Sequence, residues 1–222
     1  MSTFTTHPSM ELRRVSGNFC CALRRGLRTC AVAATMAFVL SGCAWIEGGG
    51  GNLEVRSLGH ERVALGGSFE YAYYETPKAE QASFLLSDVS PDKMMEGGVQ
   101  NARVMHIELL WQPMAGKTPL DPTATNASVR YVIVSEGEVG IYVGAGFATV
   151  SGTPGDETLS LSVHDASMEL AEHTAGFRDL LSPGELSGSF TAKKSEEKAK
   201  KLHYGVSQVV TNTLGTSRFV MR

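Results

Sequence analysis

Four side chains in the sequence carry groups that could do acid–base or metal chemistry. His106 and Glu108 are two residues apart, so both point to the same face if this segment is an extended strand. His164 and Asp165 are adjacent further along the chain. Imidazole and carboxylate groups can bind a metal ion or transfer protons, but either task needs a third ligand or a partner group. These four residues are therefore the catalytic candidates if the fold brings them together; otherwise each simply faces solvent.

Two other segments look like nucleotide-binding motifs but lack essential parts. Gly116-Lys117-Thr118 matches the end of a phosphate-binding loop, yet Trp111 stands where the first glycine belongs, and Pro119 prevents the helix that must follow. The glycine-rich run 140–146 lacks the third glycine of a dinucleotide-binding fingerprint. No G-x-S-x-G or H-E-x-x-H motif is present. We therefore expect no bound nucleotide, cofactor or metal, and a hydrolase remains an alternative without a motif.

The elements that would position these residues are mostly strands. In segment 102–111, Met105 and Trp111 share one face and His106 lies on the other. In the later segment the apolar alternation slips by one residue, which predicts a bulge or turn at His164-Asp165. Segments 90–98 and 112–127 contain proline and glycine and are predicted to be loops. The predicted strands are 53–58, 68–75, 83–89, 102–111, 129–134, 139–148, 158–163 and 186–192.

One strong helix is expected near the C-terminus. Ser195 is a good N-cap, Gly215 is a good C-cap, and an apolar stripe runs between them. A shorter apolar group at 177–181 also has helical spacing. The predicted fold is α+β and β-rich: a mainly antiparallel sheet or a sandwich, with one C-terminal amphipathic helix packed on it.

Cysteine content and charge restrict the function of the part after residue 42. All four cysteines lie at or before position 43, so the predicted domain has no disulfide and no thiolate metal site. Residues 1–42 hold five arginines and one acid, leaving 15 basic and 22 acidic side chains of the chain's 20 and 23, a net charge of −7. Such a charge disfavours nucleic acid as a partner, because a phosphate-binding surface needs excess positive charge.

The N-terminal segment has the features of an export signal. Five arginines precede a short apolar run, 31–40, which is too short to cross a bilayer. The sequence Leu40-Ser41-Gly42-Cys43 then resembles the lipobox of bacterial lipoproteins. That resemblance implies that the Cys43 thiol is acylated and that the chain is cut just before it. Because Ala44 rather than Asp follows, it also implies the outer membrane, at its periplasmic face, if the host has two membranes.

These observations predict three segments and a location. Residues 1–42 form a lipoprotein signal peptide, 43–52 carry the lipidated Cys43 and a tether around the four glycines 48–51, and 53–222 form a single β-rich domain. We expect an extracytoplasmic protein held to the membrane through lipid on Cys43, with a non-catalytic binding or scaffolding role and an envelope protein as a possible partner. The alternative is an envelope hydrolase or metal-assisted enzyme using the four candidate residues.

Overall fold

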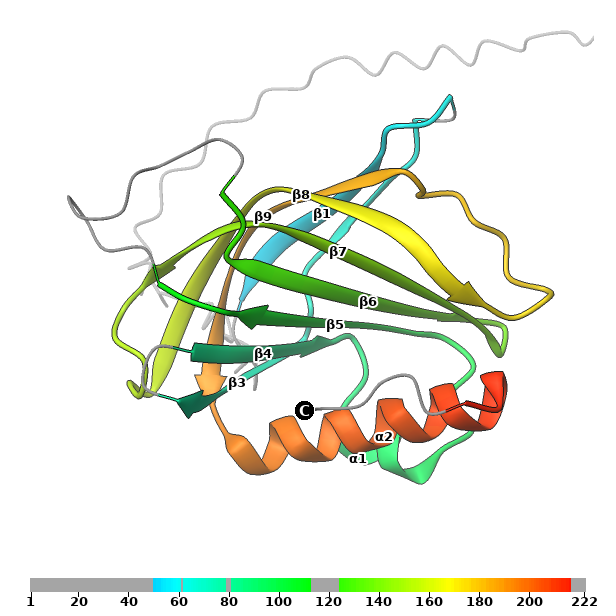
Figure 1. Ribbon diagram of the computed structural model, residues 1–222. Coiled ribbons are helices and arrows are strands. Elements are labelled where there is room, and N and C mark those ends of the chain that lie inside the picture. Colours follow the sequence, from blue (N-terminus) through cyan, green and yellow to red (C-terminus); the bar gives the residue numbers. More distant parts are fainter. Residues whose placement is uncertain (1–49, 61, 79–80, 113–123, 217–222) are drawn as a thin grey trace, which may run out of the picture. The chain divides into compact units, whose positions relative to one another are not determined.

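The computed structural model describes residues 50–60, 62–78, 81–112 and 124–216. Within these residues, nine strands form one sheet and two helices pack on it (Figure 1). Neither helix is long and apolar enough to cross a membrane. The helices are α1 (Pro91–Glu96) and α2 (Glu196–Leu214). The strands are β1 (Gly51–Ser57), β2 (Ala64–Gly67), β3 (Tyr71–Lys78), β4 (Gln81–Ser87), β5 (Ala102–Leu109), β6 (Ala127–Ser135), β7 (Glu138–Ser151), β8 (Thr158–His173) and β9 (Gly184–Lys194).

Strand β9 makes the sheet close on itself. The strand order is β2-β1-β9-β3-β4-β5-β6-β7-β8, and β8 also pairs with β9. One edge of β9 pairs with β8, while its other edge pairs first with β1 and then, in parallel, with β3 at Lys193 and Lys194. The remaining pairings are antiparallel. The predicted β-rich α+β fold is confirmed, as one large sheet rather than a sandwich of two.

Strand alternation divides the apolar residues into an inner and an outer core. On β5, Met105, Ile107 and Leu109 belong to the inner core, enclosed by the curved sheet, whereas Val104 belongs to the outer core. The outer core fills the space between the sheet and the helices, with α2 covering the outer face of the sheet at the bottom of Figure 1. From α2 it includes Ala199, Leu202, Val206 and Val210. The predicted alternation of β5 and the packed C-terminal helix are both confirmed.

Helix α1 lies within the segment 90–98, so the prediction of a loop there is wrong. Ser90 caps its N-terminus, and Pro91 occupies the first turn, where a missing N–H costs nothing. Met94 is buried, and a Cβ on Gly205 of α2 would lie 2.7 Å from its Cγ. The two helices therefore pack against each other so closely that only glycine fits on the α2 side. A helix of six residues depends on this packing, which the local pattern does not reveal.

Two further differences concern the strand boundaries and the loop after β8. Strand β1 begins at Gly51, two residues before the predicted start, and β8 runs on through the predicted slip to His173. The slip itself is confirmed as a bulge: the β8–β9 register shifts between Val163 and Ala166, and Asp165 has φ of 45°. The segment 177–181 is not helical but belongs to the loop 174–183, between β8 and β9.

Candidate functional site

His106 and Glu108 lie on the outer face of β5, beneath α2. The Nε2 of His106 is 2.9 Å from Ser83 Oγ on β4 and 3.9 Å from Glu108 Oε1. The ring of His203, on α2, is 6.0 Å away, centroid to centroid. Arg130 on β6 is the backbone partner of His106 across the strand pair. The fold thus gathers a polar cluster of these five residues at the interface between sheet and helix.

Both histidines of this polar cluster are held in the neutral form at neutral pH. Burial lowers the pKa of His106 to about 4, and the nearby charge of Arg130 adds to the effect. Burial, followed by His106 and Arg130, also lowers the pKa of His203 to about 4, with Glu108 opposing the change. An imidazole with such a low pKa is a weak proton acceptor.

Ser83, His106 and Glu108 are the residue types of a hydrolytic triad, but their arrangement differs from one. In a working triad the serine and the carboxylate contact opposite nitrogens of the imidazole, so that one nitrogen is oriented while the other takes the proton. Here Ser83 and Glu108 both approach Nε2. Ser83 is 4% exposed and His106 is 2% exposed, so a substrate cannot reach the hydroxyl. The hydrogen bond between Ser83 and His106 satisfies these two buried groups beneath α2, and sequence reasoning missed Ser83 because its partner lies 23 residues away.

His164 and Asp165 lie at the bulge of β8, in different surroundings. His164 Nε2 is 3.3 Å from Thr149 Oγ1 of β7, and Asp165 accepts a hydrogen bond of 2.9 Å from Ser187 of β9. Both contacts are exposed. Asp165 adopts a positive φ, and this backbone conformation accommodates the extra residue that the bulge inserts into β8.

The structure does not bring the two candidate pairs together. Strands β6 and β7 separate β5 from β8, so three inter-strand steps, about 14 Å, lie between them. When the strand pairing is followed from His106 across β6 and β7, the residue reached on β8 is Glu169, not His164. Within the described ranges, no group of three or more His, Cys, Asp or Glu side chains could hold a metal ion. The four candidate residues therefore do not form one site in the described part of the chain.

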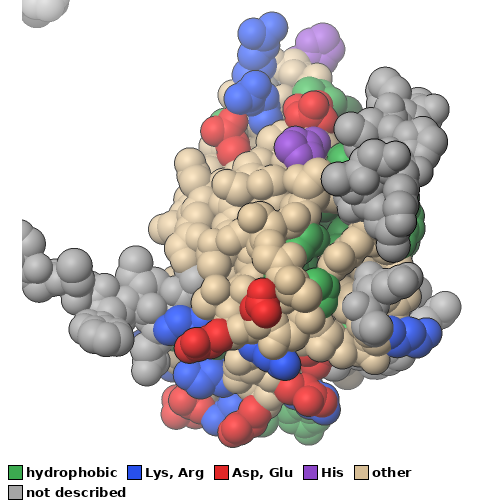
Figure 2. Space-filling model, turned by 90° about the vertical axis from the view of Figure 1, so that its left-hand side faces the viewer, with side chains coloured by type: hydrophobic (Ala, Val, Ile, Leu, Met, Phe, Trp, Pro, Cys, Tyr) green, Lys and Arg blue, Asp and Glu red, His purple; other side chains and the backbone are tan. Residues whose placement is uncertain are grey.

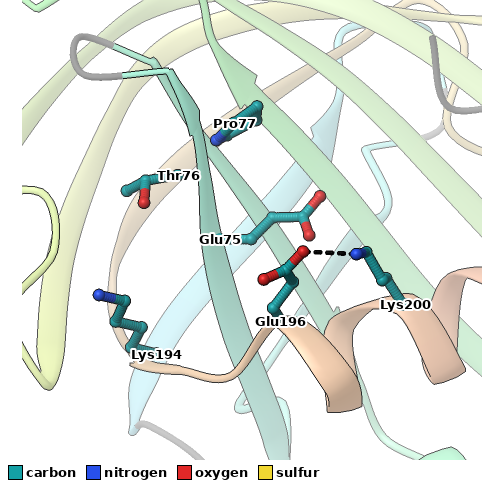
Figure 3. A pocket seen from close by; sticks show the side chains of 6 residues that line it. All are labelled: Glu75, Thr76, Pro77, Lys194, Glu196 and Lys200. Carbon is teal, nitrogen blue, oxygen red and sulfur yellow. Dashed lines mark hydrogen bonds and ion pairs between the residues drawn. The ribbon is translucent and has the colours of Figure 1, made fainter.

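A surface pocket of about 300 Å³ lies where β3, the end of β9 and the start of α2 meet (Figure 3). Burial raises the pKa of Glu75, the charge of Glu196 adds to this, and Lys200 opposes it. Glu196 and Lys200 form an ion pair four residues apart on α2. The lining residues are Glu75, Thr76, Pro77, Lys194, Glu196 and Lys200. The two carboxylates and two ammonium groups offset each other, so the pocket favours neither anionic nor cationic ligands.

Charges of both signs also mix on the helix layer. Figure 2 shows Lys and Arg side chains interleaved with Asp and Glu at the bottom of the view, where the helices lie, while little charge shows in the middle of this face. Lys201 of α2 pairs with Asp92 of α1, which ties the two helices together. The face drawn in Figure 2 thus has no continuous basic surface of the kind that binds nucleic acid.

The N-terminal end of the described chain is fixed to the sheet. Thr191 of β9 donates a hydrogen bond of 2.9 Å to the carbonyl of Gly50. A Cβ on Gly51 would lie 2.3 Å from Phe190 Cα, so the close approach of β1 to β9 requires glycine there. The lipobox with Cys43, and the loop residues Gly116-Lys117-Thr118, lie outside the described residues.

Comparison with known proteins gives no match to any protein family, to any curated protein or to any solved structure.

Proposed function

We propose that the chain is an extracytoplasmic lipoprotein, anchored by lipid on Cys43, whose folded domain binds or scaffolds another envelope component without catalysis. The observation that carries this proposal is the position of the lipobox cysteine relative to the fold. Cys43 precedes Gly51, the first residue of β1, by eight residues. Eight residues span at most about 29 Å, so a lipid on Cys43 would keep the domain at the bilayer surface. With Ala44 after the cysteine, the proposed location is the periplasmic face of the outer membrane in a host with two membranes.

The absence of catalysis in this proposal rests on the geometry of the polar residues. Ser83 and His106 are buried beneath α2, and His164 and Asp165 lie three strands away. A nucleophile and its base must be reachable by substrate and mutually aligned. The enzymatic alternative therefore has less support than binding or scaffolding, for which exposed strands and loops suffice.

The anchor is tested by mass spectrometry of the protein purified from its host. We expect a mature N-terminus at Cys43 that carries the mass of attached acyl chains. Cys43→Ser should leave an unprocessed precursor without acyl chains, because the acceptor thiol is gone. Ser41→Ala is the matched control and should be processed normally, because alanine is an accepted residue at that lipobox position. A normally cut, soluble domain from Cys43→Ser would refute the anchor.

The binding role is tested separately by affinity capture of the membrane-anchored protein, followed by mass spectrometry of what is retained. We expect a defined envelope protein or small ligand to be enriched with the wild-type chain. The Cys43→Ser variant serves as the reference, since its unprocessed, non-acylated precursor should lose partners that require the mature, lipid-anchored form. Recovery of carrier lipids alone would count against scaffolding.

A further inference from the structure

An apolar cavity of about 260 Å³ lies where β2, the end of β6 and the loop 174–183 meet. In Figure 1 this loop leaves β8 and lies beside the turn between β6 and β7, where the amide of Gly176 donates to Glu138. The apolar lining consists of Val63, Leu65, Ile133, Phe177, Leu180 and Leu181. Most of these side chains pack against the inner core, so the floor of this open cavity is the edge of the hydrophobic interior. Apolar recesses of this kind are typical ligand sites.

Arg178 is the one charged side chain among the described residues that line this cavity. The neighbouring acid, Asp179, is already engaged by three donors. Its Oδ1 accepts hydrogen bonds from the Tyr142 hydroxyl at 2.9 Å and from the amides of Leu181 and Ser182 at 3.0 and 3.1 Å. Although burial alone would raise the pKa of Asp179, these donors lower it overall. In the described part of the chain, no carboxylate lies within 4.0 Å of Arg178.

A second cavity, of about 270 Å³, adjoins the first and is more polar. Ser57, His60, Ser182 and Asp179, whose Oδ1 is taken up by the three donors named above, contribute to its lining. Arg178 and Leu180 line both cavities, so the guanidinium lies where an apolar compartment meets a polar one. This succession of an apolar recess, a cation and a polar recess has the chemistry that an amphiphile with an anionic end requires.

We propose that these two cavities bind an amphiphile: an apolar chain seated among Leu65, Ile133 and Phe177, ending in an anionic group beside Arg178. This names the ligand class of the proposed binding role and so rests on that proposal. A methylene occupies about the volume of a water molecule, about 30 Å³, so the apolar cavity takes a chain of roughly eight carbons. Carboxylate and phosphate head groups share the required charge, and a guanidinium can bind either through two donors.

The surface around the two cavities also favours an apolar ligand. Leu180 is 40% exposed and Leu58 is 59% exposed. The amide of Leu58 donates to the carbonyl of Pro183 at 2.7 Å, which places Leu58 beside the same loop. Gly51, at the anchored end of β1, is about 20 Å along the strand from Ser57, which lines the second cavity. The two cavities therefore lie at the end of β1 that is farther along the chain from Cys43.

The test is equilibrium dialysis of radiolabelled octanoate against the full chain reconstituted in phosphatidylcholine nanodiscs, with protein-free discs as background. We expect saturable binding of octanoate, and competition by octyl phosphate that shows whether carboxylate or phosphate is preferred. Octanol should bind about tenfold more weakly, and octyltrimethylammonium more weakly still, because only an anion gains from the guanidinium. Whether the chain elutes with the discs reports the lipid anchor independently of ligand binding. If the chain elutes without the discs, it carries no anchor, and its octanoate binding is then measured in solution.

Variants at the cavity, with one matched control, assign any binding to this site. Arg178→Gln should weaken octanoate binding about tenfold and leave octanol unchanged. Val63→Trp fills the apolar cavity and should abolish both; if it fails to fold, as judged by circular dichroism, Ser135→Leu at the mouth of the cavity decides instead. Lys93→Gln, which removes the same charge from α1, is the matched control and should change nothing. Octanoate binding that is absent, that is unaffected by filling the cavity, or that is no stronger than binding of the cation would overturn the proposal.

Discussion

The imidazole rings of His106 and His203 meet edge to face across the interface between β5 and α2, with centroids 6.0 Å apart and an interplanar angle of 74°. One ring belongs to the sheet and the other to the helix that covers it. The groups that face them include Ser83 from β4, Glu108 from β5 and Arg130 from β6. Two titratable groups therefore stand at the contact that holds α2 on the sheet.

We predict that acid destabilises the fold through these two histidines. Burial lowers the pKa of each from 6.5 to about 4. Between these values the unfolded chain takes up protons that the folded chain does not, so stability falls as pH drops from 6.5 towards 4. The loss reaches about 3 kcal/mol for one fully shifted histidine. Urea unfolding at a series of pH values between 7.5 and 4 measures it.

Two variants separate the contribution of the histidines to this pH dependence from that of the carboxylates. His203→Leu should reduce the dependence of unfolding free energy on pH in this window, since one of the two proton acceptors is removed. Asn212→Leu introduces the same side chain at an exposed, non-titratable position of α2 and should leave the dependence unchanged. Equal slopes for the wild type and His203→Leu would show that His203 does not contribute.

Ser83→Ala should destabilise the fold by about 1–2 kcal/mol, because His106 Nε2 loses a buried partner at 2.9 Å. Thermal and urea unfolding both report the change. Ser187→Ala is the control: it also removes a hydroxyl partner of a candidate residue, Asp165, but at an exposed site, where the cost should stay below about 0.5 kcal/mol. Similar losses for the two variants would contradict the structural role of the Ser83–His106 contact.

Gly205→Ala should destabilise the protein although alanine is the better helix former. In a free helix this change stabilises by about 1 kcal/mol. Here the added Cβ would lie 2.7 Å from Met94 Cγ and 2.9 Å from its carbonyl carbon, so α1 must move. Overpacking of this kind costs about 1–3 kcal/mol. Urea unfolding should therefore show a net loss, whereas Asn212→Ala, at an exposed position on the same helix, should be neutral or stabilising.

Much of the fold follows from local patterns that the sequence displays. The alternation around His106 sets the two faces of β5, and the slip at His164-Asp165 marks the bulge, because strand periodicity is a local property. Ser195 and Gly215 both cap α2 as predicted, since caps depend on the backbone of a single turn.

The features that were not predicted depend on contacts between distant segments. Helix α1 is too short to be stable alone and exists because Met94 packs on Gly205. Closure of the sheet needs β9 to pair with β8, β1 and β3, which no local pattern specifies. The sequence could not show whether the four candidate residues meet for the same reason: strand order, which separates β5 from β8, is a long-range property.

Gly140→Ala should disturb the loop 174–183 and the cavity beside it. A Cβ at this position would lie 2.2 Å from two carbons of the Phe177 ring, which rests on the glycine and meets Tyr142 edge-on at 6.2 Å. Because the ring has to move, we expect a loss of about 1–3 kcal/mol. Amide exchange should also accelerate at Phe177, whose N–H is bonded to the Thr174 carbonyl in the loop.

The energetic coupling between Gly140 and Phe177 can be measured by a double-mutant cycle. Phe177→Leu alone should cost stability, because an aromatic contact is lost, but in the Gly140→Ala background it should cost less or even restore stability, because the smaller side chain leaves room for the Cβ. Gly50→Ala is the control glycine, since a Cβ there meets nothing within 4 Å. Strictly additive effects of Gly140→Ala and Phe177→Leu would mean that the two residues do not constrain each other, and the loop would then have to be held mainly by Asp179 and its three donors.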